Sequence, residues 1–501
     1  MSDHRPKTRR GRLFIAIAVI AAAALAAAAA IAVARRSPSV AANGGNQARL
    51  AVLPFDDLAG DDEQYFADGL HEEMIVRLGR LQPRRLAVIA RGSVLPYRGA
   101  AKSIATIARE LGVDYVLEGS VRHANDRFRI TAQLIRADNQ SQLWSETYDR
   151  SWKDVFAIQA DVAARVADSL AVELVPAYEA AVGGDRRRVS PQAYEHYLRG
   201  RFYWNQRVRD PAAHLARAIQ EFQMAIAEQG DYAEAFAGLA DAYDSVFFAS
   251  PGYAADVPSR ARQTIERALQ LDPALASAHS TRAWMTLHFD HDVTLAEQRF
   301  RRALELDPND ALTRMRLSHV LAAHGRLREA EDEARTARRY DPLSAPIADI
   351  IAWYRYYAGA NADALTQMAE AADLDGTPAK RQLFTAYLAA VGGRCSEAVS
   401  EAGAVPLTSD TMRMGELAFV TARCGDVAAG DRLVRELTGR RLAYPAAMFY
   451  FGRRQLDAFY DWLNRAIDER FPELLYIGVD PVFAGERESH RFQASMRRVG
   501  L

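Results

Sequence analysis

One short phrase recurs along the second half of the chain at an almost constant spacing. It reads ALQLDP at residues 268–273, ALELDP at 303–308 and ARRYDP at 337–342. Pro308 lies 35 residues after Pro273, and Pro342 lies 34 residues after Pro308. In each copy a proline closes a run of helix-forming residues that it cannot itself continue. The fixed period predicts stacked copies of one supersecondary unit, because a single unit cannot bury its apolar face alone.

A period near 34 residues is typical of tetratricopeptide repeats, in which each unit is a pair of antiparallel helices. Gly230 and Gly376 take the place of the proline in the flanking copies, and Gly325 is expected in the turn within a pair. We expect repeats over residues 191–400, followed by degenerate repeat helices and a C-terminal cap over 401–501. Small residues at matching places predict close helix crossings: Ala218, Ala261, Ala296, Ala330, Ala364 and Ala398.

Arrays of this family bind peptides or protein segments on a concave face that the first helix of each pair lines. The resemblance implies that Asp241, Ser280, Trp284, His288, Met315, His319, Asp349, Trp353, Tyr356, Tyr357, Lys380 and Tyr387 face this groove. Its aromatic side chains would suit an apolar or aromatic peptide anchor. The alternative is that some of them pack between units, which is the commonest fate of large aromatic residues. The groove lacks the basic and amide residues of the carboxylate-clamp type, so an acidic C-terminal tail is not the expected ligand.

Residues 49–180 predict a separate α/β domain. Two short apolar runs and two helical faces precede three strands of alternating character, and a helix from about residue 155 to 174 follows. The order β-α-β-α-β-β-β-α indicates a mixed sheet with helices packed on it.

Three motifs in this part resemble the TolB N-terminal-like domain: AVLPFDDLAGDDEQYFADGLHEEM, ELGVDYVLEGSVR and RITAQLIRADNQSQLWSETYDR. The resemblance implies a small binding or assembly domain without a catalytic residue set. Relatives often carry a winged-helix or nucleotide cyclase domain before it, and we expect this chain to lack both. The pieces DPVF and RFQASMRRVGL resemble the usual ending of the family's repeat arrays, which implies a cap over the apolar end of the array.

The N-terminal residues predict a membrane anchor. Residues 13–34 form an uncharged run of 22 residues, long enough to span a bilayer. The preceding arginines and lysine favour a cytoplasmic tail at 1–12, with the rest of the chain in the bacterial periplasm. A cleaved signal peptide ending at Ala32-Val33-Ala34 is the alternative. Residues 35–48 and 181–190 are expected linkers.

The composition and motifs point away from catalysis and nucleic acid. The formal net charge is −1, and phosphate-binding and nucleophile motifs are absent from the sequence. The acidic stretch DDLAGDDE and the stretch HFDHD are interpreted as a capped loop and a turn, so we expect no metal and no cofactor. Cys395 and Cys424 lie in turns of adjacent pairs, where a disulfide is conceivable in an oxidising compartment.

These patterns predict a non-catalytic scaffold or adaptor of the bacterial inner membrane, which binds other proteins or peptides and no nucleic acid. A sensory or regulatory component without an effector domain is the second hypothesis.

Overall fold

The computed structural model describes residues 47–57, 64–81, 83–124, 127–151, 189–207, 210–249, 256–403 and 410–501, with single positions between 158 and 169 and at 405. The predicted cytoplasmic tail, the membrane-spanning helix at 13–34 and most of both linkers lie outside these residues. The same holds for residues 58–63 of the acidic stretch. Within the described ranges, every helix is too short or too polar to cross a bilayer.

A mixed sheet forms the core of the N-terminal domain, as the sequence predicts. Its strands are β1 (Ala48–Val52), β2 (Asp56–Asp57), β3 (Leu86–Val88), β4 (Tyr115–Ala124), β5 (Arg127–Arg136) and β6 (Gln142–Ser151). The order is β3-β1-β4-β5-β6, with β2 beside β4. Strand β1 runs parallel to β3 and β4, whereas β4, β5 and β6 are antiparallel. Helices cross over between the parallel strands, and short loops join the antiparallel ones.

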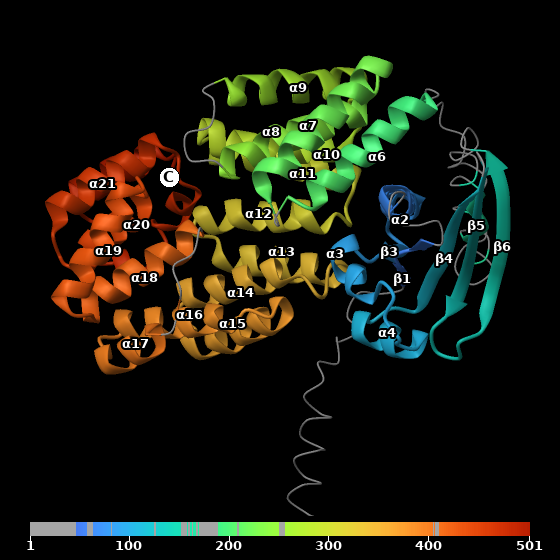
Figure 1. The fold of residues 1–501 in the computed structure, drawn as a ribbon. Helices are drawn as coiled ribbons and strands as arrows, with labels where there is room; N and C mark the ends of the chain where they lie inside the picture. The colour runs from blue at the N-terminus through green and yellow to red at the C-terminus, as the bar shows by residue number, and fades with distance from the viewer. Residues whose placement is uncertain are drawn as a thin grey trace, which may run out of the picture. The chain divides into compact units, whose positions relative to one another are not determined.

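Helices α2 (Gln64–Leu81) and α4 (Ile104–Leu111) cover opposite faces of this sheet (Figure 1). Leu50 and Val52 of β1 share a cluster with α2, and Ala51 shares another with α4. Since alternate residues of a strand point to opposite faces, residues 50–52 of β1 are buried on both, which explains why this part of the strand is apolar throughout. Gly112 ends α4 at φ +64°, as a C-terminal glycine does.

The sequence did not predict β2, the short helix α3 (Arg91–Val94) or the 3₁₀ turn η2 (Leu95–Tyr97). Elements of two to four residues are too short to show a periodicity. Most of the helix expected over residues 155–174 lies outside the described residues.

Antiparallel helix pairs make up the rest of the described chain. The first helices of the pairs are α6 (Pro191–Asn205), α8 (Ala233–Ala249), α10 (Ala276–Met285), α12 (Ala311–Ala323), α14 (Ala345–Tyr357), α16 (Pro378–Val391), α18 (Thr411–Cys424) and α20 (Ala443–Gly452). Their partners are α7 (Pro211–Glu228), α9 (Val257–Leu271), α11 (Val293–Leu306), α13 (Leu327–Tyr340), α15 (Asn361–Asp375), α17 (Cys395–Ala402), α19 (Val427–Gly439) and α21 (Leu456–Asp468). A π-helical turn η4 (Thr286–Asp290) extends α10. The chain ends with the 3₁₀ turns η5 (Pro472–Tyr476) and η6 (Pro481–Phe483) and helix α22 (His490–Arg498).

The packing explains the repeated phrase. The six alanines that mark the repeat are all completely buried, because a larger side chain would force the crossing helices apart. Gly325, in the turn between α12 and α13, has φ +73°, and Gly376 ends α15 at φ +66°. Both are conformations that glycine adopts without a steric penalty. The predicted turn positions are therefore confirmed.

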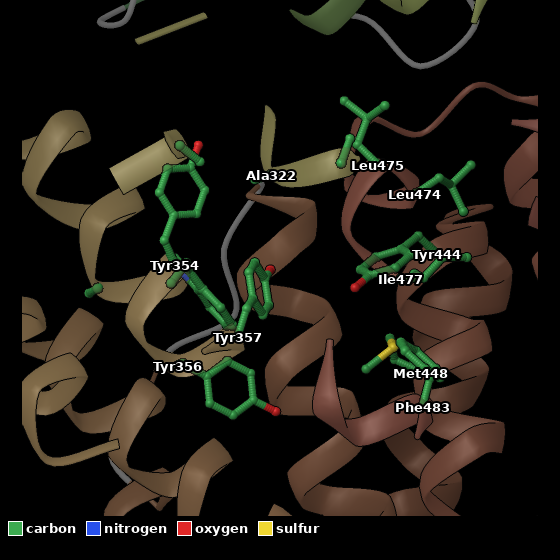
Figure 2. Packing of buried hydrophobic residues seen from close by; sticks show 14 of the residues in the cluster. Ala322, Tyr354, Tyr356, Tyr357, Tyr444, Met448, Leu474, Leu475, Ile477 and Phe483 are labelled. Carbon is green, nitrogen blue, oxygen red and sulfur yellow. The ribbon is translucent and has the colours of Figure 1, made fainter. Parts of the chain in front are cut away.

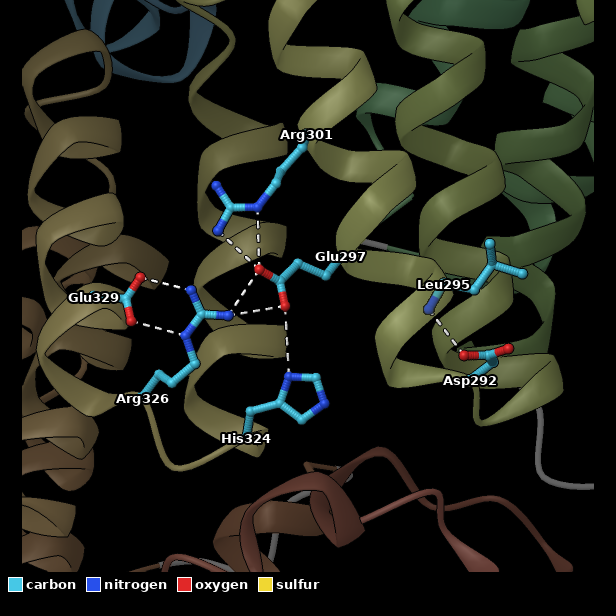
Figure 3. A network of polar contacts seen from close by, with 7 residues as sticks. All are labelled: Asp292, Leu295, Glu297, Arg301, His324, Arg326 and Glu329. Atoms are coloured by element: carbon cyan, nitrogen blue, oxygen red, sulfur yellow. Dashed lines mark hydrogen bonds and ion pairs between the residues drawn. The ribbon is translucent and has the colours of Figure 1, made fainter.

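Polar contacts join successive pairs as well (Figure 3). Glu297 of α11 accepts hydrogen bonds from Arg301 of its own helix and from Arg326 in the following pair, each at 2.8 Å. Arg326 also pairs with Glu329 at 2.6 Å. At the start of α11, the Asp292 carboxylate accepts from the backbone of Leu295 at 2.9 Å. Such partly exposed pairs add little stability each, but they hold the neighbouring pairs in register.

The first domain packs on the repeats along α2 and α6, within the compact unit Ala48–Leu501. Arg201 of α6 forms an ion pair with Glu72 of α2, and Asn205 donates to the second oxygen of Glu72 at 3.0 Å. Tyr65 of α2 donates to Glu195 at 3.2 Å. Leu198 of α6 belongs to the core of the first domain. The two domains therefore share one interior.

A second contact uses the turns that carry the repeated DP phrase. The Ser93 hydroxyl donates to Asp341 at 2.5 Å and accepts from the Leu343 amide at 2.8 Å. The Ala90 amide donates to the Tyr340 carbonyl at 2.7 Å. One repeat earlier, the Asn309 side chain donates to two backbone carbonyls beside β3 at 2.9 and 3.1 Å. Two equivalent turns thus hold the edge of the sheet.

We predict that Glu72→Ala destabilises the protein by roughly 3 kcal/mol, because it leaves the mostly buried Arg201 without its counter-charge. The measurement is the urea midpoint followed by near-ultraviolet circular dichroism. Glu305→Ala is the matched control, since Glu305 pairs with Arg302 in an exposed contact and should change stability by at most about 1 kcal/mol. Equal effects of the two substitutions would contradict the shared interior.

Candidate peptide-binding face

The first helices of the pairs form one continuous surface, here called the first-helix face. All the residues that the sequence assigns to a groove lie on these helices or on η4. The structure divides them by exposure. Asp241, Trp284, Met315 and His319 are partly buried, on α8, α10 and α12. Asp349 on α14 is partly buried as well, and the rest are buried: Ser280, His288, Trp353, Tyr356, Tyr357, Lys380 and Tyr387.

The C-terminal segment, residues 471–483, explains this burial. It crosses the first-helix face, so the aromatic residues of α14 and α16 pack beneath it. The Tyr476 hydroxyl contacts Nδ1 of His319 on α12, and the Tyr476 ring stacks on Tyr357 of α14 with ring centres 5.8 Å apart. Thr411 of α18 donates to Glu473. The segment therefore contacts the first helices of four successive pairs.

Asp480 is the polar anchor of the C-terminal segment. Its carboxylate accepts hydrogen bonds from the Tyr356 hydroxyl at 2.8 Å and from the Tyr387 hydroxyl at 3.0 Å, on α14 and α16. It also accepts from the backbone of Val482 at 2.9 Å, which starts η6. Figure 2 shows Tyr356 and Tyr357 in one buried cluster with Ile477 and Phe483 of the segment. The DPVF motif was predicted to cap the end of the array; its aspartate also closes part of the face.

Two buried carboxyl groups belong to the C-terminal segment, Glu473 and Asp480, and a third, Glu416 of α18, faces Asp480. Burial raises the pKa of Asp480 to about 6, of Glu473 to about 7 and of Glu416 to about 8. The raised values mean that the folded protein holds these groups more readily in their neutral form. Asp349, beside them, pairs with Arg413 at 3.1 Å.

A small pocket, here called the tyrosine pocket, opens between the segment and the first-helix face. It has a volume of about 10 Å³, roughly enough for one water molecule. Gly415 lets α18 approach α20, since a Cβ there would lie 2.7 Å from the Tyr444 ring. The pocket is lined by Trp353, Tyr357, Tyr387, Met412, Glu416, Tyr444, Met448, Tyr476, Ile477 and Asp480.

The other half of the first-helix face combines aromatic and charged groups. The Arg316 guanidinium lies 5.0 Å from the centre of the Trp284 ring, and the His319 ring centre lies 5.9 Å from it. Asp241 accepts from Thr281 at 2.6 Å. Burial lowers the pKa of His319 to about 4, so the imidazole is neutral at pH 7. This part of the face therefore presents the partly exposed side chains of Trp284 and Met315 beside the positive charge of Arg316.

The two histidines of the HFDHD stretch have different environments in the structure. His288 is buried, with its Nδ1 3.0 Å from the Trp284 carbonyl, and burial lowers its pKa to about 3. His291 adopts a left-handed conformation at φ +53°, where it ends η4. Among the described residues, histidine, cysteine and carboxylate side chains do not gather in a group suited to a metal ion.

Cys395 and Cys424 are joined by a disulfide with Cα atoms 4.9 Å apart. Cys395 begins α17, and Cys424 ends α18. The bond therefore joins the turns of two adjacent pairs, as their positions in the repeat allow.

Sequence reasoning missed several residues of this face. Arg316, Glu416 and Tyr476 carried no signal, because a charged residue in a helix usually faces solvent and a tyrosine near a chain end has no assigned partner. Asp480 had a weak signal in DPVF, where an aspartate before a proline marks a turn. Its two tyrosine partners lie about a hundred residues away in the sequence.

Two family models match this chain. The model described as the HilA/YgeH-like transcriptional regulator, second domain, covers residues 46–165, and the tetratricopeptide repeat model covers residues 290–354. The helical region therefore contains tetratricopeptide repeats, as its period predicts. The TolB-like assignment of the first domain stays a prediction.

A curated protein of Rhizobium meliloti (strain 1021), named putative adenylate cyclase 3, is 36% identical over 253 residues. The match covers 50% of this chain and 35% of that protein, so this chain spans about a third of its relative's length. Among solved structures, the type IV pilus biogenesis factor PilW matches 42% of this chain and 91% of its own, with a TM-score of 0.35 and 16% identity. TolB from Acinetobacter baumannii matches 25% of this chain and 28% of its own, with a TM-score of 0.20 and 18% identity.

The buried carboxyl groups predict a pH-dependent stability. Glu473 has a pKa raised by burial from 4.5 to about 7, so the folded protein keeps this proton over a range in which the unfolded chain has lost it. The contribution of Glu473 to the free energy of unfolding should therefore fall as the pH rises from about 4.5 to about 7, and then level off. Glu473→Gln should remove this contribution, of about 1–3 kcal/mol between about pH 5 and about pH 8.

The measurement is urea denaturation of the wild type and of Glu473→Gln at about pH 5 and about pH 8. Glu488→Gln, at an exposed position near the same end of the chain, should keep the wild-type slope. A Glu473→Gln protein with an unchanged slope would show that Glu473 ionises freely in the folded state.

Proposed function

We propose that this protein is a non-catalytic scaffold that binds other proteins or peptides on the first-helix face of its tetratricopeptide repeats. The observation that carries the proposal is the row of partly exposed side chains that α8, α10 and α12 present: Asp241, Trp284, Met315 and His319. An aromatic side chain at the centre of a recessed surface is the usual anchor of a protein interface. At this part of the face the C-terminal segment contacts His319, and Asp241 and Trp284 keep part of their surface exposed.

The location is inferred from the sequence and belongs to the same proposal. The apolar run at residues 13–34 would anchor the protein in the bacterial inner membrane, with its TolB-like first domain and its repeats in the periplasm. The disulfide between Cys395 and Cys424 supports an oxidising compartment. In such a place a tethered scaffold collects partners by raising their local concentration.

A regulatory role is the second candidate. It is favoured by the relative named putative adenylate cyclase 3 and by the match to a domain of HilA/YgeH-like transcriptional regulators. In a regulatory protein of this kind, a signal molecule or protein would bind the first-helix face, and a separate partner protein would supply the effector domain. The docking of two DP turns on the sheet provides a route by which a change in the repeats would reach the first domain.

The proposal predicts site-specific contacts in living cells. A photo-crosslinking amino acid in place of Met315, on the first-helix face, should form covalent adducts with a partner protein. The same residue in place of Arg335, an exposed position on a second helix, should form none. With the recovered partner purified, Trp284→Ala should weaken binding about tenfold or more, as removal of a central aromatic anchor does. Adducts of equal yield from both positions would contradict the first-helix face as the binding surface.

Protease accessibility decides the location. We expect an added protease to digest the repeats only after the outer membrane is opened. Protection that lasts until the inner membrane is lysed would contradict the periplasmic assignment.

A further inference from the structure

The tyrosine pocket has the chemistry of a binding site for a positively charged group. Aromatic rings from α14, α16, α20 and the C-terminal segment surround it, and two carboxyl groups, Glu416 and Asp480, face into it. The faces of aromatic rings attract cations, and the attraction grows where water is excluded. Carboxyl groups among the rings add charge of the required sign.

Glu416 is the one of these two carboxyl groups that has an oxygen without a hydrogen-bond partner, although the Arg413 guanidinium faces it. Its side chain lines the pocket, its residue is only 4% exposed, and its Oε2 has no hydrogen-bond partner. Asp480 is satisfied by two tyrosine hydroxyls and a backbone amide. A buried carboxyl oxygen without a partner is costly, and proteins usually satisfy such groups. The oxygen therefore indicates a donor that comes from outside the chain.

The neighbouring cations already have acidic partners in the chain, and Arg413 faces Glu416 as well as these partners. Arg413 pairs with Asp349 at 3.1 Å and with Asp410 at 3.2 Å. Lys380 pairs with Asp349 at 3.5 Å and with Asp375. An anionic ligand is disfavoured, because it would meet Glu416 and Asp480 in the pocket itself.

The size of the pocket selects among cations. About 10 Å³ holds a group of the size of a water molecule, which matches a primary ammonium group. A trimethylated ammonium group is larger and has no N–H to donate. A primary ammonium group has three donors and can satisfy the free oxygen of Glu416.

We propose that the tyrosine pocket binds a primary ammonium group, as found at the end of a lysine side chain, with Glu416 as its counter-ion and the surrounding rings as its cage. This inference rests on the proposed function and adds to it the chemistry of one partner residue. The site lies on the same first-helix face, next to the C-terminal segment.

Binding of this group is coupled to a proton. Burial raises the pKa of Glu416 to about 8, with Arg413, Asp410, Asp349 and Asp480 as the charged groups that face it. The carboxyl group is thus mostly protonated at pH 7, and an arriving ammonium group favours its ionised form. Binding should release a proton at pH 7 and should strengthen as the pH rises toward about 8.5, below the lysine pKa of about 10.4.

Calorimetric titration of the full 501-residue chain tests the proposal. The probes are Nα-acetyl-lysine methylamide, its Nε-trimethyl derivative and n-butylamine. The lysine derivative should bind, the trimethyl derivative should bind at least about tenfold more weakly, and the binding heat at pH 7 should depend on the buffer because a proton is released. Equal binding of both derivatives, or no binding of the lysine derivative, would overturn the proposal.

A variant identifies the counter-ion. Glu416→Gln keeps the size of the side chain and should weaken binding of the lysine derivative at least about tenfold, and should abolish the dependence on buffer. Glu436→Gln, in an exposed pair with Arg440, is the matched control and should bind like the wild type. Wild-type affinity in Glu416→Gln would overturn the role of Glu416. The comparison of methylated and unmethylated probes on the wild type decides the proposal even if this variant fails to fold.

The remaining outcomes distinguish a free amine from a lysine-containing peptide as the ligand. They also distinguish failure of the ammonium site from failure of the proposed scaffold function. Butylamine that binds as tightly as the lysine derivative identifies a free amine as the ligand, whereas tighter binding of the lysine derivative identifies a peptide; both support the ammonium site. Adducts at position 315 together with no amine binding would overturn the pocket and leave the scaffold. Amine binding without adducts would leave the pocket and overturn the scaffold.

Discussion

The hydrogen bonds between Asp480 and two tyrosines hold together the C-terminal half of the repeats. Tyr356 and Tyr387 belong to successive first helices, and one carboxylate accepts from both. Without Asp480 the two buried hydroxyls could bond only to each other, and one of their two protons would lack an acceptor, which is costly in an apolar interior. The segment that carries Asp480 therefore has to lie on the first-helix face, and the aromatic residues there become core rather than open groove. What is left for a partner is the part around Trp284 and the small pocket beside the segment.

The repeated DP turn has two roles in this fold. Within the array it ends one pair and starts the next, because its proline cannot continue a helix. At residues 340–343 and at Asn309 the same turns also hold the edge of the first domain through backbone and side-chain hydrogen bonds. In a repeat protein, each unit usually contacts only the units directly before and after it. Here a globular domain spans α6 and two later turns, so it ties together units that are separated along the array.

The sequence predicts those parts of the structure that depend on local patterns. The alanine positions, the turn at Gly325 and the three longer strands follow from periodicity and from turn chemistry, and the structure confirms them. The burial of Trp353 and Tyr387 could not be read in this way, because it depends on a segment about a hundred residues away that folds back. The repeat register places a side chain on the first-helix face, but it does not say what covers that face. The contact between Ser93 and Asp341, 248 residues apart, is long-range in the same sense.

The position of the C-terminal segment decides which part of the first-helix face is open, and amide hydrogen exchange of the full chain measures this position directly. The amides of Val479, Asp480 and Phe483 are hydrogen-bonded to nearby backbone carbonyls, and the segment is packed against the core cluster. Exchange at residues 474–483 should therefore be as slow as in the buried helices α14 and α16. Rapid exchange there, with slow exchange in α14 and α16, would contradict the account, because the face would then be open over its whole length.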